Sequence, residues 1–444
     1  MTTAAKQQLV STRLEREMVA LRELSARVGS EPLLVQASNG NTSIKSEGTL
    51  WIKASGRWLA NATREELFMA VDLEAAKESL QADSEISPIS GQTGDLHPSI
   101  ETPMHAAIPH RVVIHVHSIN AISWAIRQDG PAQVTERLAG LRWQWIPYAA
   151  SGNPLAREIA KAAARAPETN VFILGSHGLV VCGNDCDSAE QLLREVDWRL
   201  AMPPRKYPKP DIAALTVLAR FPGWQFPVVE SMHALATDAT CRNILQAGVL
   251  YPCQAIFLGQ TVPLLPVRIA ESEFRQWLAA QDRVPPFVIV EGIGVMINEK
   301  ITSAERATLR ALAEVTLRTP ESAPLRYLNA GEVADVLCQG AHGGKEVSAK
   351  KEPAKAFPHP VTYTLPQPVL HAVQRPVPYS VTRWVTHSVR HSVTYSVTYS
   401  LTTITRTDMG RRSLHSLNAC ASWLGSHSRK LRSRIASARI GLGA

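Results

Sequence analysis

Residues 112–118 read VVIHVHS, an apolar run interrupted by two histidines. β-branched residues are typical of a buried strand, in which side chains alternate between the two faces of a sheet. The alternation places His115 and His117 on one face, about 7 Å apart along the strand. Two buried imidazoles are costly unless they share a partner, and at this separation both can bind one cation. The spacing therefore predicts a metal site at this strand.

A third ligand is expected from residues 171–183, VFILGSHGLVVCG, which predict a strand, a turn and a second strand. His177 lies in the turn, and Gly178 after it permits a close approach of the backbone. His105 and His110 are nearer in sequence to the histidine pair, but a helix and its exit are expected there, where solvated or capping roles are more common. Three neutral imidazoles leave one coordination position open, which is typical of a catalytic zinc-type site.

A carboxylate precedes the histidine strand. Residues 99–110, SIETPMHAAIPH, predict a helix with Ser99 as its N-cap, and Glu101 lies on this helix. A metal that polarises a substrate carbonyl or hydroxyl needs a base to take the adjacent proton, and a desolvated carboxylate suits that task. The alternative is a first-turn glutamate that is favoured only by the helix dipole.

Two loops are small, polar and glycine-bearing: residues 38–43 (SNGNTS) and residues 53–56 (KASG). Backbone N–H groups and hydroxyls in such loops can bind an anion such as phosphate. Ordinary turns have the same composition, so the pattern alone leaves both interpretations open.

Helical and strand patterns alternate through residues 1–205, which predict one α/β domain. The helices are expected at residues 5–28, 119–127, 154–165 and 188–200. After a proline-rich linker, residues 206–340 repeat the mixed pattern and predict a second α/β domain.

The second domain contains a possible internal repeat. Residues 287–315 follow the same order of strand, turn, strand and helix as residues 172–196. In this alignment Glu291-Gly292 replaces His177-Gly178, and no His-x-His motif precedes it. The second domain is therefore interpreted as a degenerate partial copy that lacks the metal ligands, with chance similarity as the alternative.

Residues 341–444 form a basic, low-complexity tail that includes the repetitive stretch HSVTYSVTYS. The whole chain has a formal charge of +8, but residues 345–444 hold 15 Lys and Arg against three acidic residues, so the body is mildly acidic. We expect the tail to be disordered, with a β-prone segment and the product of a shifted reading frame as alternatives. Its arginines lie outside any recognisable nucleic-acid fold, so a nucleic-acid partner is not expected.

No run in the sequence approaches the roughly 20 consecutive apolar residues of a membrane span. The N-terminal residues lack an apolar signal core. The expectation is a cytoplasmic protein without membrane contact.

Several motifs follow one another in a characteristic order. They are GNTS (40–43), KASG (53–56), SIETPMH (99–105) followed by HVHS (115–118), and SHGLVVCG (176–183) followed by SAEQ (188–191). Together they resemble the class II aldolase and adducin head-domain family, which includes fuculose-phosphate and rhamnulose-phosphate aldolases and ribulose-phosphate epimerases. The resemblance implies a three-layer α/β/α sandwich with a mostly antiparallel central sheet.

The resemblance also implies roles for individual residues. A divalent metal, usually zinc, is expected on His115, His117 and His177, with Glu101 as the acid/base carboxylate. The sequence departs from the family at Ser99-Ile100, where the family has a pair of serines. The positions that match the family's phosphate-binding residues are Asn41, Ser55, Gly56 and Ser99.

The function implied is that of a metal-dependent lyase, which cleaves or forms a carbon–carbon bond of a small phosphorylated ketose through a metal-stabilised enediolate. Sugar-phosphate epimerase, dehydratase and decarboxylase activities use the same chemistry and remain alternatives. A non-catalytic, adducin-like scaffold is an alternative of another class. Because many family members place their active sites at subunit interfaces, a homo-oligomer is expected.

Overall fold

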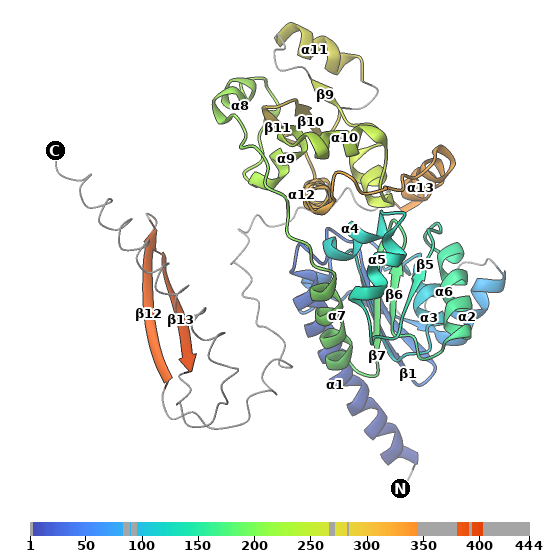
Figure 1. Ribbon diagram of the computed structural model, residues 1–444. Coiled ribbons are helices and arrows are strands. Elements are labelled where there is room, and N and C mark those ends of the chain that lie inside the picture. Colours follow the sequence, from blue (N-terminus) through green and yellow to red (C-terminus); the bar gives the residue numbers. More distant parts are fainter. Residues whose placement is uncertain are drawn as a thin grey trace. The chain divides into compact units, whose positions relative to one another are not determined.

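The computed structural model describes residues 3–82, 89, 96–265, 271–281, 284–343, 380–389 and 393–402. The chain divides into two compact units, residues 1–356 and 357–444. The first unit contains two sheets with their helices (Figure 1).

The larger sheet carries the histidine strand at its centre. Its described strands follow the order β3-β2-β1-β4-β7-β6-β5. They are β3 (Phe68–Asp72), β2 (Thr49–Lys53), β1 (Asn41–Ser46), β4 (Val112–Val116), β7 (Gly178–Gly183), β6 (Val171–Leu174) and β5 (Trp143–Ile146). β5 and β6 run parallel, whereas the other neighbours run antiparallel. The sheet is therefore mixed: one parallel pair stands among the antiparallel pairs that the resemblance implies, because a helical crossover returns the chain to the sheet in the same direction between β5 and β6.

Helices cover both faces of this sheet. Val112, Ile114 and Val116 of β4 belong to a buried cluster with residues of α1, α4 and α7. Val113 belongs to the cluster on the other face, with residues of α3 and α6. The helices of this half are α1 (Thr3–Gly29), η1 (Leu59–Asn61), α2 (Leu73–Ala82), α3 (Thr102–Ala107), α4 (Ile119–Ala125), α5 (Gly130–Arg137), α6 (Asn153–Arg165) and α7 (Cys186–Leu200).

Local sequence determines where these helices begin, as α7 shows. Its N-cap is Asp185, whose carboxylate accepts a hydrogen bond of 2.7 Å from the backbone N–H of Ser188. The hydroxyl of Ser188 in turn accepts one from the backbone N–H of Asp185, which completes a capping box. The four predicted helices of this half are confirmed, within a few residues, as α1, α4, α6 and α7. Helices α2 and α5 and strand β5 were not predicted from the sequence pattern.

The smaller sheet lies in the second half of the first unit. Its described strands follow the order β8-β11-β10-β9, and β10 and β11 pair antiparallel. The strands are β8 (Trp224–Gln225), β9 (Leu264–Leu265), β10 (Phe287–Val290) and β11 (Gly294–Asn298). The helices are α8 (Ile212–Leu218), η2 (Glu230–His233), α9 (Ala234–Thr237), α10 (Ala239–Ala247), η3 (Gln254–Leu258), α11 (Glu271–Ala279), α12 (Ser303–Arg318) and α13 (Ala330–Gly343). That this half is a partial copy of the first stays a prediction.

The register of the two hairpins can be compared directly. In the β6–β7 hairpin Leu174 pairs with Gly178, and in the β10–β11 hairpin Val290 pairs with Gly294. Three turn residues therefore lie between the paired ends of each hairpin.

This register corrects the alignment predicted from the sequence. His177 is the last turn residue of its hairpin and corresponds to Ile293, not to Glu291. The alignment of the His-Gly and Glu-Gly dipeptides is wrong because Gly178 opens a strand, whereas Gly292 lies inside the turn with a φ of 71°. Since an isoleucine side chain has no donor for a metal, the second hairpin has no counterpart of His177.

The two halves of the first unit share a hydrophobic core. Ile119 and Ile122 of α4 belong to one buried cluster with Leu309 of α12. Backbone hydrogen bonds also join residues 126–128 to residues 324–326. Because α4 follows directly after the histidine strand, the second half is anchored close to the candidate site.

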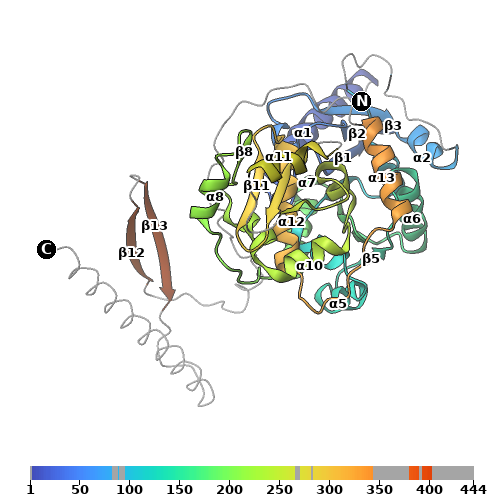
Figure 2. The ribbon, with the colours of Figure 1, turned by 90° about the horizontal axis from the view of Figure 1, so that it is seen from above.

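Helix α13 extends the contact between the halves toward β5 (Figure 2). The side-chain amide of Gln339 donates a hydrogen bond of 3.4 Å to the carbonyl oxygen of Ser151. Tyr148, in the loop after β5, packs in one cluster with Val333 and Val336 of α13.

The described residues of the second unit form a hairpin. Its strands β12 (Ser380–Val389) and β13 (Val393–Thr402) pair antiparallel. The β-prone stretch, which was the alternative to a disordered tail, overlaps β13. Of the predicted tail, the structure describes only the end of α13, β12 and β13, and the rest lies outside the described residues. Across the described ranges of the chain, no helix combines the length and the apolar character needed to cross a membrane.

Candidate metal centre and active site

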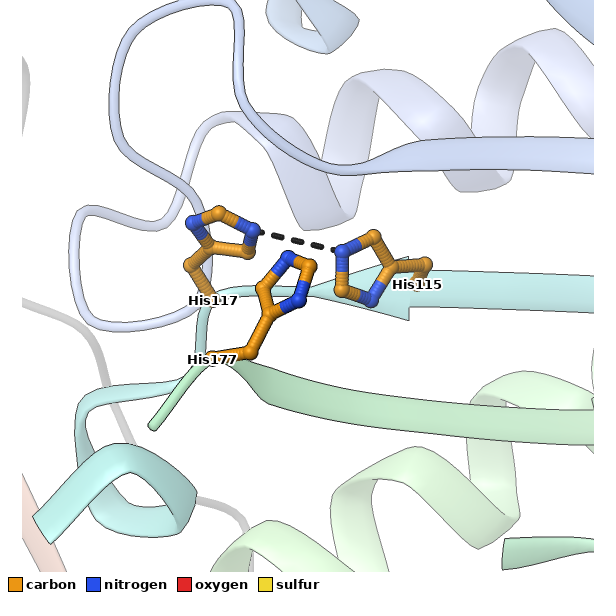
Figure 3. A group of neighbouring side chains, drawn as sticks. All are labelled: His115, His117 and His177. Atoms are coloured by element: carbon orange, nitrogen blue, oxygen red, sulfur yellow. Dashed lines mark hydrogen bonds between the residues drawn. The ribbon is translucent and has the colours of Figure 1, made fainter. Parts of the chain in front are cut away.

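The structure brings His115, His117 and His177 together (Figure 3). Their candidate ligand atoms all lie within 4.8 Å of one another, and the ring centroids of each pair are 5.0 Å apart. The three rings meet edge to face, and all three side chains are buried.

Two neighbouring strands position these histidines. His115 lies in β4 and His117 follows its end, while His177 closes the turn before β7. At Ser176 the turn has a φ of 48°, a left-handed conformation that reverses the chain within three residues. A Cβ atom on Gly178 would lie only 2.6 Å from a backbone carbonyl oxygen of β4. Glycine at this position therefore permits the close approach that brings His177 to the other two imidazoles.

Hydrogen bonds determine which ring nitrogen faces the centre. Nδ1 of His115 lies 3.1 Å from the carbonyl oxygen of Leu179, and Nδ1 of His117 lies 3.4 Å from Sγ of Cys253. The Nε2 atoms of these two histidines are 3.2 Å apart. Nδ1 of His177 is buried without a hydrogen-bond partner among the described residues. An imidazole with its proton on Nδ1 presents a lone pair at Nε2, which is the form that binds a metal.

Glu101 adds a carboxylate to the centre. Its Oε1 lies 3.4 Å from Nε2 of His115 and 3.3 Å from Nε2 of His177. Its Oε2 accepts a hydrogen bond of 2.8 Å from the side-chain amide of Asn41. Burial alone would raise the pKa of Glu101, but the charges and hydrogen bonds of His115 and His177 outweigh burial and hold the pKa well below its usual value. The group is therefore an ionised carboxylate.

The helix that leads into the centre begins later than predicted. α3 starts at Thr102, and its N-cap is Glu101, with a φ of −93° and a ψ of 3°. Ser99, the predicted N-cap, instead accepts a hydrogen bond of 3.2 Å on its hydroxyl from the backbone N–H of Glu101. The prediction was wrong because residues 99–102 form a turn, closed by the hydrogen bond of 2.9 Å from Thr102 N to Ser99 O. This turn places the Glu101 carboxylate at the end of the helix, facing the histidines.

Burial favours the neutral form of two of the imidazoles. It lowers the pKa of His117, and the charges of His115 and His177 lower it further. It also lowers the pKa of His177, although Glu101 opposes the effect. For His115, burial is outweighed by the charge and hydrogen bond of Glu101, so the pKa is raised. At His117 and His177 burial thus favours the neutral form that a metal ligand requires, and at Glu101 the carboxylate is ionised, as such a site also requires.

Three of the separations between these atoms suit a tetrahedral ion. Two donors that each lie about 2.1 Å from one tetrahedral zinc ion are roughly 3.4 Å from each other. The measured separations are 3.2 Å between the Nε2 atoms of His115 and His117, and 3.4 Å and 3.3 Å from Glu101 Oε1 to Nε2 of His115 and His177. Since imidazole and carboxylate are donors that zinc accepts, the residues present fit one divalent cation.

The residues predicted to bind a phosphate fall into two groups. Asn41 and Ser99 lie beside Glu101, and the amide of Asn41 donates a hydrogen bond of 3.2 Å to the Ser99 hydroxyl. Ser55 and Gly56 lie in the exposed loop after β2, where Gly56 has a φ of 69°. Phosphate binding by all four residues stays a prediction.

Lys53 connects the two loops that were predicted to bind an anion, although the sequence analysis gave it no role of its own. Its side chain is 2% exposed. The terminal nitrogen donates hydrogen bonds to the carbonyl oxygens of Ser38 (2.8 Å), in the first loop, and of Arg57 (2.7 Å), directly after the second loop. Burial lowers the pKa of Lys53 to about 7, with the charge of Glu101 acting in the opposite direction. Lys53 thus fixes the relative position of the loops and adds positive charge near them.

His105 contradicts the expectation that it is solvated or caps a helix. Its side chain is fully buried. Nδ1 lies 2.7 Å from the hydroxyl of Ser43, and Nε2 makes a short hydrogen bond with Oδ1 of Asn41. The expectation was wrong because α3 buries this side chain against the sheet. His105 therefore orients Asn41, which in turn orients the Glu101 carboxylate.

Comparisons with known proteins match the part of the chain that carries these residues. Residues 20–202 match the family described as the Class II Aldolase and Adducin N-terminal domain. The chain is 28% identical over 181 residues to an uncharacterized oxidoreductase, YuxG, of Bacillus subtilis, an alignment that covers 37% of this chain but only 26% of that protein. It is 29% identical over 177 residues to Methylthioribulose-1-phosphate dehydratase of Klebsiella pneumoniae (strain 342), covering 36% of this chain and 82% of that protein.

Among solved structures, the N-terminal Class II Aldolase domain of a conserved protein from Thermoplasma acidophilum is 23% identical, with a TM-score of 0.36. That match covers 40% of this chain and 90% of the other. Residues 20–202, which carry the three histidines and Glu101, belong to the class II aldolase and adducin N-terminal domain family.

Proposed function

We propose that this protein is a metal-dependent lyase of the class II aldolase type that acts on a small phosphorylated ketose. The proposed ion is zinc, held by His115, His117 and His177, and the proposed base is Glu101. The observation that supports this proposal best is the convergence of imidazole Nε2 atoms and Glu101 Oε1 at separations of 3.2, 3.3 and 3.4 Å. The proposed reaction is reversible cleavage of a carbon–carbon bond of the ketose.

The chain's own residues suit the proton transfer that such a reaction needs. A bound divalent cation would supply Lewis-acid polarisation of the substrate carbonyl. Glu101 is placed to take the proton from the adjacent carbon or hydroxyl, since its Oε1 faces the centre while Asn41 holds its Oε2. Contact with the histidines makes the resting carboxylate a weak base. A substrate oxygen that displaces Oε1 from them would therefore raise the pKa of Glu101 and increase its basicity.

Dehydration of a ketose phosphate is the second candidate reaction. The similarity to Methylthioribulose-1-phosphate dehydratase, which extends over 82% of that protein, favours it. Loss of water begins with the same proton transfer beside a carbonyl, so the same carboxylate can serve. The two reactions differ in the bond that breaks next, which is carbon–carbon in one and carbon–oxygen in the other.

A non-catalytic scaffold accounts less well for the site. Three buried imidazoles and a buried carboxylate carry a desolvation cost that apolar residues of similar size would avoid. A metal that binds all four residues would offset this cost.

A screen of ketose phosphates with metal-loaded protein tests the proposal. Release of an aldehyde reports cleavage, and a product lighter by one water reports dehydration. Glu101→Gln removes the base but keeps the shape of the side chain, so kcat is expected to fall by at least about 100-fold. The control is Glu74→Gln, in the first turn of α2 on the protein surface, which should leave kcat unchanged. Unchanged turnover by Glu101→Gln would contradict its role as the base, and a wild-type protein that converts none of these substrates would count against both reactions.

A further inference from the structure

One cysteine of the second half reaches the histidine centre of the first half. Cys253 lies 136 positions after His117 in the chain, yet its Sγ is 3.4 Å from Nδ1 of His117. The cysteine is 7% exposed and the histidine 6% exposed, so water does not compete for this contact. The second half of the chain therefore touches a candidate metal ligand directly.

The loop that carries Cys253 is held rigidly. The side-chain carbonyl of Gln254 accepts a hydrogen bond of 2.9 Å from the backbone N–H of Leu250, and its amide donates one of 3.4 Å to the carbonyl of Gly248. The carbonyl of Val249 accepts a further hydrogen bond of 2.8 Å from the backbone N–H of Leu328. Cys253 then caps the π-helix η3, a rare conformation that is frequent at functional sites. The position of Sγ is thus set by the fold of this half.

The sulfur lies on the side of the His117 ring that faces away from the centre. Nε2 of this ring points toward Nε2 of His115, whereas Nδ1 points toward Cys253. A histidine that binds a metal through Nε2 keeps its proton on Nδ1 and needs an acceptor there, which fixes the tautomer and the plane of the ring. For His115 that acceptor is the carbonyl oxygen of Leu179, at 3.1 Å.

We propose that Cys253 is the positioning residue of His117: its sulfur accepts the Nδ1–H hydrogen bond and holds Nε2 toward a divalent cation. This inference rests on the proposed metal site. It gives the second half of the chain a role in metal affinity, even though none of the described residues of that half belongs to the histidine cluster. The second half thereby stabilises the site from outside the family domain.

Metal affinity of cysteine variants tests this role. Cys253→Ala removes the acceptor, and we expect the dissociation constant for Co²⁺, measured by competition with a chelator, to rise about 10-fold. Cys253→Ser keeps a hydrogen-bond acceptor, but on a shorter side chain, and should therefore recover part of the metal affinity. Cys241→Ala is the matched control, because Cys241 is also a buried thiol of the second half but contacts Arg205.

Two further readouts separate positioning from a general loss of structure. The visible spectrum of bound Co²⁺ should change in Cys253→Ala and stay as in the wild type in Cys241→Ala. In metal-free Cys253→Ala, nitrogen NMR of ring-labelled histidine should show His117 losing its preference for the Nδ1–H tautomer.

The outcomes distinguish this inference from the proposed function. A wild-type protein that binds no stoichiometric metal would overturn the metal site itself. If the wild type binds metal and Cys253→Ala binds it equally tightly, only the role of Cys253 fails. An equal loss of affinity in Cys241→Ala would also overturn that role, because any buried thiol would then suffice.

Discussion

The side-chain amide of Asn41 donates a hydrogen bond of 2.8 Å to Oε2 of Glu101, the carboxylate oxygen that does not face the histidines. Asn41 opens β1 and pairs in register with His115 of β4, so one pair of strands positions both the carboxylate and a histidine. The side-chain carbonyl oxygen of Asn41, Oδ1, is in turn hydrogen-bonded to Nε2 of His105. A chain of buried polar contacts thus runs from α3 through β1 to the centre.

Asn41→Ala is expected to reduce catalysis more than metal binding. The substitution leaves Glu101 Oε2 without its donor, so the carboxylate loses its fixed orientation, and we expect kcat to fall roughly 10- to 100-fold. Metal content should remain near that of the wild type because no proposed ligand is lost. Asn39→Ala serves as the control, because Asn39 lies in the same loop and its amide nitrogen has no hydrogen-bond partner among the residues that the structure describes. If steady-state kinetics give the same kcat for Asn41→Ala and Asn39→Ala, this role of Asn41 is contradicted.

Gly178→Ala is expected to disrupt the centre through the backbone. The new Cβ would lie 2.6 Å from the carbonyl oxygen of Val116 and 3.3 Å from the ring of His117. The strands β4 and β7 must separate to accommodate it, which should cost roughly 2–3 kcal/mol of unfolding free energy and most of the bound metal. Urea unfolding and metal analysis measure both effects.

The control for this variant is Gly331→Ala, near the start of α13, where the nearest atom to a new Cβ belongs to a side chain and lies 3.3 Å away. It should unfold like the wild type. Full metal content in Gly178→Ala would show that the close approach of the strands is not needed for the site.

Lys53 should make the stability of the metal-free protein depend on pH. Burial lowers its pKa to about 7 in the folded state, whereas an unfolded lysine has a pKa of about 10.4. Between these values the unfolded chain binds a proton that the folded chain has released, so folding stability rises with pH. From pH 7 to pH 9 we expect the wild type to gain about 2 kcal/mol relative to Lys53→Met.

Urea unfolding at the two pH values measures this difference. Lys161→Met is the control, because the side chain of Lys161 is 65% exposed. Parallel changes in stability for wild type and Lys53→Met would mean that Lys53 stays protonated in the folded protein.

The sequence alone was sufficient to predict the parts of the site that depend only on the spacing of neighbouring residues. The alternation of a strand placed His115 and His117 on one face, and the turn between two apolar runs placed His177 at a strand end. Both inferences need only the periodicity of a strand and the flexibility of glycine. Four helices were likewise predicted from their apolar periodicity and their ends.

Contacts between distant segments could not be predicted in this way. From the sequence, His105 is a helix residue without a special role. Only the packing of α3 against the sheet brings its ring to Asn41 and Ser43. Cys253 belongs to a segment with no motif, and only the shared core of the two halves brings it to His117. The correspondence between the two hairpins also required the pairing register, because dipeptides that look alike occupy different places in the two turns.

Metal analysis of purified protein after equilibration with zinc tests whether His115, His117 and His177 bind an ion. We expect one zinc ion per chain in the wild type, less than about a tenth of that in His177→Ala, and wild-type content in His110→Ala, whose ring is half-buried outside the centre. A wild-type protein without stoichiometric metal, or equal zinc in His177→Ala and the wild type, would show that the three histidines are not a metal site.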